Sequence, residues 1–161
     1  MGLAQTLLTI AAISLLSMIT LTLNSSYLTT NQVMIESEFS IEAISIAESY
    51  LERAIGKSFD EKTITSQVTQ ISNFTYPPAR ESGEIKLTDF DDFDDFHGFN
   101  TKDTTERAIY NVSISVAYVN ENNPDQAIVG KSWYKRMTIT VSQPDFMPSQ
   151  PIQLQFIYSY F

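Results

Sequence analysis

Apolar residues dominate the first third of the chain, and their spacing predicts one long helix. Residues 3–23 read LAQTLLTIAAISLLSMITLTL, and no charged side chain occurs among the first 35 residues. A helix needs about 20 apolar residues to cross the hydrocarbon core of a bilayer, so residues 3–23 are long enough for one span. The helical spacing continues without proline to Ile55. This predicts a helix of about 50 residues, about 75–80 Å long at a rise of about 1.5 Å per residue.

The second half of the predicted helix, residues 33–55, is amphipathic. Its polar stripe consists of Glu38, Glu42, Ser45, Ser49 and Glu52. Its apolar stripe consists of Phe39, Ala43, Ile46, Tyr50 and Ala54, with Ile41, Ile44, Leu51 and Ile55 beside it. So wide an apolar arc is typical of a helix that packs on a sheet.

Residues 20–31 join the two halves and read TLTLNSSYLTTN. Thr, Ser and Asn are poor helix formers because they lose rotamers or hydrogen-bond their own backbone. We expect the helix to continue through this segment, with hydroxyls bonded to carbonyls one turn back. We also expect this segment to be the least stable part of the helix.

Residues 109–119, 133–141 and 152–160 alternate apolar and polar side chains, which predicts half-buried strands. The apolar faces consist of Tyr110, Val112, Ile114, Val116 and Tyr118 in the first, Trp133, Met137, Ile139 and Val141 in the second, and Ile152, Leu154, Phe156, Tyr158 and Tyr160 in the third. Strands joined by short loops, including a turn at 120–125, form an antiparallel meander with one buried face. The sequence thus predicts an α+β fold in which the long N-terminal α-helix packs on a C-terminal antiparallel β-sheet.

The predicted organisation has an apolar helix half and a globular head. The ranges are 1–32 for the apolar half and 33–161 for the head, which is divided into helix half 33–55, connector 56–107 and sheet 108–161. Within the connector we expect a short helix or irregular turn over 62–72 and extended backbone around Pro77. A short edge strand is expected at 84–87.

Composition excludes several functions. The net charge is −9, the acidic residues gather in the head, and there is no basic stripe of the kind that binds nucleic acid. Because there is no cysteine, the chain has no disulfide, thiolate metal site or cysteine nucleophile. The single histidine, His97, precedes Gly98 and is expected in a turn. With no nucleophile elbow and no glycine-rich phosphate loop, we predict no catalytic residues and no enzyme activity.

The run DFDDFDDF, residues 89–96, is the most distinctive local motif. Carboxylate oxygens are ligands that Ca²⁺ prefers, and the candidates are Asp91, Asp92, Asp94 and Asp95, although their spacing is not that of an EF-hand. The simpler interpretation is a solvated loop whose phenylalanines, three residues apart, anchor it to the sheet. The residues leave both interpretations open, and no other cofactor is expected.

Three triplets match the N-glycosylation acceptor pattern, at Asn24, Asn73 and Asn111. Asn24 falls inside the predicted helix. Such triplets are frequent by chance, so Asn73 and Asn111 become candidates only if the chain is displayed outside the cell.

The layout of the whole chain resembles that of type IV pilins and related pilin-like subunits: a Met start, an apolar helix half, an amphipathic half, an irregular connector and an antiparallel sheet. In that family a peptidase removes a short basic leader, so the resemblance implies that Met1 is the mature, methylated first residue. Family members typically carry glutamate at the fifth mature position, where it pairs with the N-terminal amine of a neighbour. This chain has Gln5 there, which accepts a hydrogen bond but lacks the charge.

The resemblance implies a structural subunit of an extracellular, cell-surface filament that waits in the inner membrane as a monomer. It then polymerises with identical copies, aided by the pilus assembly machinery. Because helix association in lipid depends on packing, we expect small residues at the helix contacts. These are Ala11, Ala12, Ser14 and Ser17.

The alternative is a single-span membrane-anchored binding module whose head recognises a ligand or Ca²⁺ and does not polymerise. The two functions differ in what they require of residues 36–55. A polymerising subunit needs an apolar stripe that faces neighbours in addition to the stripe that faces the sheet, whereas an anchored module needs only the second.

Overall fold

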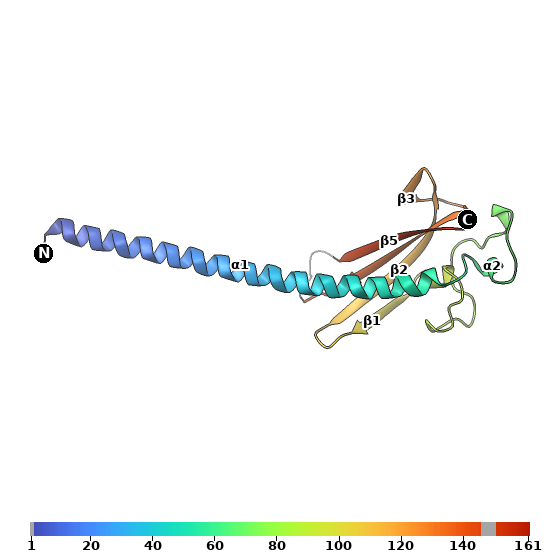
Figure 1. Cartoon of the computed structure of the whole chain (residues 1–161), viewed down its shortest axis with the longest axis horizontal. Helices are drawn as coiled ribbons and strands as arrows, with labels where there is room; N and C mark the ends of the chain where they lie inside the picture. The colour runs from blue at the N-terminus through green and yellow to red at the C-terminus, as the bar shows by residue number, and fades with distance from the viewer. Residues whose placement is uncertain (1, 146–150) are drawn as a thin grey trace. The chain divides into compact units, whose positions relative to one another are not determined.

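The protein is described by a computed structural model that covers residues 2–145 and 151–161. It divides into two compact units, Met1–Glu38 and Phe39–Phe161. Helix α1 (Leu3–Ile55) contributes to both units, and the β-sheet belongs to the second (Figure 1).

The first unit is the N-terminal part of α1. Every side chain from 2 to 30 is exposed, and α1 is long and apolar enough to cross a membrane. The helix continues through 20–31, where threonine hydroxyls donate hydrogen bonds of 2.8–3.0 Å to carbonyls four residues earlier. The donors are Thr20, Thr22, Thr29 and Thr30. The predicted continuous helix with internally bonded hydroxyls is confirmed.

In the second unit, residues 39–55 of α1 pack on the sheet. The buried side chains of this segment are Ala43, Ile46, Ala47, Tyr50 and Ala54. The three alanines among them have no exposed surface. A polar contact adds to this packing, because the Tyr110 hydroxyl donates a 2.6 Å hydrogen bond to Glu42 Oε2. The predicted apolar stripe is confirmed as the face that packs on the sheet.

Within the described residues the sheet has five strands, all paired antiparallel. They are β1 (Asn100–Thr104), β2 (Ile109–Asn120), β3 (Asn123–Ala127), β4 (Tyr134–Ser142) and β5 (Ile152–Ser159). The order is β1-β2-β4-β5, with β3 paired to the end of β2. Ile114, Ile139 and Leu154 are neighbours in register across β2, β4 and β5. The predicted strands at 109–119, 133–141 and 152–160 match β2, β4 and β5 to within one residue at each end.

Two strands and one turn depart from the prediction. The turn expected over 120–125 is wrong beyond Asn122, because β3 begins at Asn123. Strand β1 lies in the segment that we assigned to an irregular connector. Both strands are polar and largely exposed, so neither shows the alternation that a buried face produces.

The edge strand expected at 84–87 is also wrong. The backbone turns there, since the Asp89 N–H donates to the Lys86 carbonyl at 2.8 Å, and the Lys86 N–H donates to Asp89 Oδ2 at 3.1 Å. The connector also contains three short helices in its described residues, which are α2 (Glu61–Thr65), η1 (Ile71–Asn73) and η2 (Asp94–Phe96). The helix or turn expected over 62–72 is thus confirmed in part.

The part of the second unit that the structure describes has two buried hydrophobic clusters. The larger lies between α1 and the sheet and includes Phe90, Phe93 and Phe96. The smaller consists of Phe59, Val68, Phe74 and Tyr118, with the half-buried Trp133, Tyr158 and Tyr160 against it. Charged side chains are buried beside this aromatic cluster, and they form the candidate site.

Candidate functional site

The acidic-aromatic run folds into the core. Phe90, Phe93 and Phe96 are buried, as expected for anchors. Asp92, Asp94 and Asp95 are also completely buried, whereas Asp91 is exposed. The solvated-loop interpretation is therefore wrong for three of the aspartates, although its prediction for the phenylalanines is confirmed.

The loop closes on itself through carboxylate caps, which explains how aspartates become buried here. Asp92 Oδ1 accepts from the N–H groups of Asp94 and Asp95, at 2.6 and 3.1 Å. Asp95 Oδ2 accepts from the N–H groups of Asp91 and Asp92, at 2.9 and 3.1 Å. One oxygen of each carboxylate thus holds the loop, and hydrogen bonding to the ordered backbone compensates part of its burial.

A buried lysine lies next to the loop. Lys135 Nζ donates to Asp94 Oδ2 at 2.7 Å, to Asp60 Oδ2 at 3.0 Å and to the Phe59 carbonyl at 2.7 Å. All three charged side chains have no exposed surface. Lys135 Nζ also lies 4.4 Å from the centre of the Phe59 ring and 5.0 Å from that of Tyr118, distances at which a cation is attracted to a ring face.

Asp60 joins the lysine to the connector. Its carboxylate caps α2 by accepting from the Lys62 N–H at 3.1 Å. It also accepts from the Thr75 N–H at 2.9 Å, the Thr75 hydroxyl at 3.1 Å and the Tyr118 hydroxyl at 3.2 Å. Burial alone would raise the pKa of Asp60, but the charge of Lys135 and the Thr75 N–H lower it below its ordinary value.

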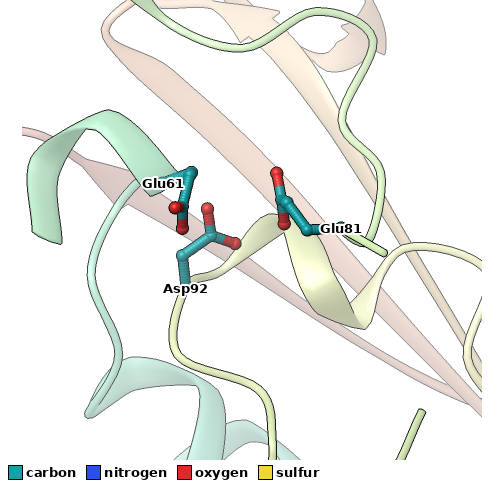
Figure 2. A group of neighbouring side chains, drawn as sticks. All are labelled: Glu61, Glu81 and Asp92. Carbon is teal, nitrogen blue, oxygen red and sulfur yellow. The ribbon is translucent and has the colours of Figure 1, made fainter. Parts of the chain in front are cut away.

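Acidic side chains from three segments of the chain meet at the aspartate run. In one group, carboxylate oxygens of Glu61, Glu81 and Asp92 all lie within 4.8 Å of one another, and the three side chains point toward each other (Figure 2). In the second group, Glu81, Glu84 and Asp95 meet the same distance condition. We call these five residues the Glu81 cluster.

The sequence-based metal candidates are only partly brought together. Asp92 and Asp95 belong to the Glu81 cluster. Asp94 is paired with Lys135 instead, and Asp91 is exposed. The three glutamates of the cluster were missed, because no local motif links them to the aspartate run. The helical cap that begins at Asp60 places Glu61, and turns in the connector place Glu81 and Glu84.

Negative charge exceeds positive charge at this site. Burial, together with the carboxyls of Asp94 and Asp95, raises the pKa of Asp92 to about 8. Burial also raises the pKa of Asp94 to about 7, although the charge of Lys135 opposes it. Burial and the adjacent Asp95 raise the pKa of Glu84 to about 8. At neutral pH a proton or a cation therefore stabilises the folded site.

Raised pKa values make stability depend on pH. With a chelator present, we expect the free energy of unfolding to fall by about 1–3 kcal/mol between about pH 5 and pH 8. The ordinary pKa of aspartate is 3.8, whereas Asp92 has a pKa of about 8 and Asp94 of about 7 in the folded protein. Unfolding in this range releases protons, so a higher pH favours it. Urea unfolding followed by Trp133 fluorescence measures the effect, and stability that is constant or rises with pH would contradict it.

The remaining predicted site residues lie on exposed surfaces. Gln5, Ala11, Ala12, Ser14 and Ser17 are exposed along α1, and Ser14 donates to the Ile10 carbonyl at 2.9 Å. Met1 lies outside the described residues. A single chain does not test contacts between chains, so the role of these residues in assembly stays a prediction.

The glycosylation and histidine positions are also placed. Asn24 is exposed on α1 and Asn73 is exposed in η1, whereas Asn111 is half-buried within β2. His97 is exposed before Gly98, which has φ = 73°, and His97 Nδ1 accepts from the Val116 N–H at 3.0 Å. The expected turn role of His97 is thus confirmed.

Comparisons with protein-family models, with curated proteins and with solved structures find no match to this chain. The resemblance to pilins therefore stays a prediction, and the function is argued from the chain's own residues.

Proposed function

We propose that the chain is a structural subunit of an extracellular type IV pilus-like filament. In this proposal the first half of α1 holds the monomer in the inner membrane, and α1 then packs against identical helices in the filament. The single observation that carries the proposal is an apolar face of α1 that the sheet does not cover. Its members in the second unit are Ile41, Ile44 and Ile55.

This face is distinct from the one that packs on the sheet. Ile41 is 67% exposed, Ile44 41% and Ile55 43%. Ile44 lies about one helical turn after Ile41, and Ile55 lies about three turns after Ile44, so the three residues share a stripe. Single exposed apolar residues are common on protein surfaces, but an aligned set favours contact with another helix. An anchored module does not require such a stripe, whereas a polymerising subunit does.

The length of α1 supports the same function. The helix has 53 residues, and a bilayer span takes about 20. The exposed isoleucines lie in the half of α1 that also carries Glu48 and Arg53, and charged side chains do not favour burial of this half in a bilayer. Packing between helices buries these side chains instead, and a head-to-tail contact that does not close generates a helical filament.

The small residues and Gln5 have roles in this proposal. Ala11, Ala12, Ser14 and Ser17 allow helices to approach closely in lipid and in the filament core. The Gln5 amide accepts a hydrogen bond from the N-terminal amine of a neighbouring subunit. Because the amide carries no charge, it stabilises a buried ammonium less than a carboxylate does.

The second candidate function is a membrane-anchored binding module that does not polymerise. The Glu81 cluster favours it, because the cluster gives the head a site of its own. The exposed isoleucine stripe discriminates between the two candidates.

An Ile44→Glu variant tests the proposed function. A glutamate placed in a contact between helices is buried without a partner, so we expect the yield of filaments to fall by at least about tenfold, equivalent to about 1.4 kcal/mol per contact. Filaments sheared from cells that produce the chain are counted and traced by cryo-electron microscopy. The matched control is Ser45→Glu, which adds the same charge on the exposed polar stripe.

Both variants should keep the thermal unfolding temperature of the head, since neither position is buried in the monomer. Normal filaments from the Ile44→Glu variant would contradict a role for the isoleucine stripe. A wild-type chain that stays monomeric in the membrane would favour the anchored module.

A further inference from the structure

We propose that the Glu81 cluster is a calcium site that fastens α2 and the turn at Glu81 to the aspartate loop, residues 89–96. The ligands are carboxylate oxygens of Glu61, Glu81, Glu84, Asp92 and Asp95, with Glu81 shared by both groups. The site lies entirely within the second unit. The proposal therefore does not depend on membrane anchoring or on polymerisation.

The spacing of the oxygens suits calcium. Within each group, one oxygen per residue lies within 4.8 Å of the others. Calcium binds oxygens at about 2.3–2.6 Å, so ligands on opposite sides of one ion lie up to about 5 Å apart. The carboxylates in Figure 2 come from α2, from the turn at Glu81 and from the aspartate loop, and they converge on a common space.

Unpaired buried oxygens provide independent support. Asp92 and Asp95 have no exposed surface, and each uses one oxygen to accept backbone N–H groups of the loop. Their other oxygens, Asp92 Oδ2 and Asp95 Oδ1, are buried without a hydrogen-bond partner, as is Glu81 Oε2. Buried polar atoms without a partner are uncommon and costly in folded proteins. The loop thus fixes each aspartate by one oxygen and leaves the other oxygen available to a cation.

The chain's own cation does not satisfy these oxygens. Lys135 is the buried basic side chain in the described part of the protein, and its three hydrogen bonds go to Asp94, Asp60 and the Phe59 carbonyl. None of them reaches the Glu81 cluster. A divalent ion supplies the positive charge that the cluster lacks.

The donor set selects the ion. The cluster contains no histidine or cysteine, which argues against zinc and other transition metals. Magnesium keeps most of its water and usually takes one or two carboxylates, whereas calcium accepts six to eight oxygens in a flexible arrangement. Each group offers carboxylates from three residues, and the two groups share Glu81, which is more than magnesium usually takes and therefore favours calcium.

The first experiment measures thermal unfolding of the full chain in detergent micelles, with Trp133 fluorescence as the signal. Adding Ca²⁺ at about 100 times the dissociation constant, relative to EGTA, should raise the unfolding temperature by about 5–10 °C. Glu81→Gln should lose most of this rise, because it removes a ligand from both groups. Glu121→Gln, an equal charge change on an exposed turn, should keep it.

An equal unfolding temperature for the wild-type chain in EGTA and in Ca²⁺ would overturn the proposal. So would a full calcium response in Glu81→Gln. In EGTA this variant should be at least as stable as the wild type, because it removes one of several mutually repelling carboxylates.

A second experiment does not depend on how any variant folds. Equilibrium dialysis of the wild-type chain against radioactive calcium, with magnesium in about tenfold excess, should retain one calcium ion per chain. No retained calcium, or calcium displaced by magnesium, would overturn the assignment.

Discussion

Replacing Lys135 by methionine should lower the free energy of unfolding by about 3–5 kcal/mol near neutral pH. Methionine fills a similar volume among the rings of Phe59 and Tyr118 but donates no hydrogen bond. The loss of the ammonium leaves the carboxylates of Asp60 and Asp94 buried without their cation. An unpaired buried charge costs more than the intact pair contributes, so the penalty exceeds that of losing a surface ion pair.

The two aspartates should respond differently. Asp60 keeps donors from Thr75, Lys62 and the Tyr118 hydroxyl. Asp94 Oδ1 already has no partner, and the bond from Lys135 to Oδ2 is the one that satisfies this carboxylate. We therefore expect Asp94 to take up a proton in the variant. The loss in free energy of unfolding of Lys135→Met, relative to the wild type, should shrink toward about pH 5, where protonation of Asp94 costs less.

Urea unfolding of wild-type and variant chains at both pH values measures this effect. The control is Lys102→Met, which removes an exposed lysine from β1 and should change stability by less than about 0.5 kcal/mol. A loss below about 1 kcal/mol in Lys135→Met would show that the two aspartates are not charged in the folded protein.

Replacing Phe93 by alanine should destabilise the second unit by about 3–5 kcal/mol. Phe93 has no exposed surface, and its ring lies edge-on to Tyr158 of β5 with centroids 5.1 Å apart. Its N–H also donates to the Ser58 carbonyl at 2.9 Å, just after α1 ends. Removing the ring leaves a cavity where the aspartate loop meets the sheet.

The matched control is Phe161→Ala, which truncates a phenylalanine that is 79% exposed. It should cost less than about 1 kcal/mol. Equal losses in the two variants, measured by urea unfolding, would contradict the packing of the loop into the core. Phe93→Ala should also weaken the proposed calcium site, because the buried ring anchors the loop that carries Asp92 and Asp95.

The predictable parts of the fold are those with one buried face. Ile114, Ile139 and Leu154 stand opposite one another in the sheet, and each belongs to an alternating segment that the sequence shows directly. The apolar stripe of α1 is equally regular. Strands β1 and β3 were missed because they lie at positions where neither face is fully covered, so their polar sequences carry no alternation.

The buried charges were missed for a different reason. Lys135 lies between Trp133 and Met137 at period two, so the alternation itself placed it on the inner face of β4. A lysine there is stable only with partners, and these are Asp60 and Asp94, 75 and 41 residues away along the chain. Partners so distant are not visible in a local pattern.

The Glu81 cluster was difficult to predict because its aspartate motif suggests a hydrated loop and because its glutamates lie elsewhere in the sequence. Only Asp92 and Asp95 belong to a motif that stands out in the sequence, and the simplest physical expectation for such a motif is a hydrated loop. Burial of that loop follows from the spacing of its phenylalanines together with the carboxylate caps. The glutamates that meet it are set by turns whose positions depend on the whole fold.

The hydrogen bond between Tyr110 and Glu42 has a mechanical consequence. Three of the five buried side chains on the face of α1 that lies on the sheet are alanines, and a methyl group interlocks with the sheet less than a larger side chain does. A pull along the axis of α1 would load this contact in shear. Two hydrogen bonds would then transmit the force from α1 to the sheet. One is the 2.6 Å bond from Tyr110 of β2 to Glu42, and the other is the 3.4 Å bond from Tyr50 to Asp103 of β1.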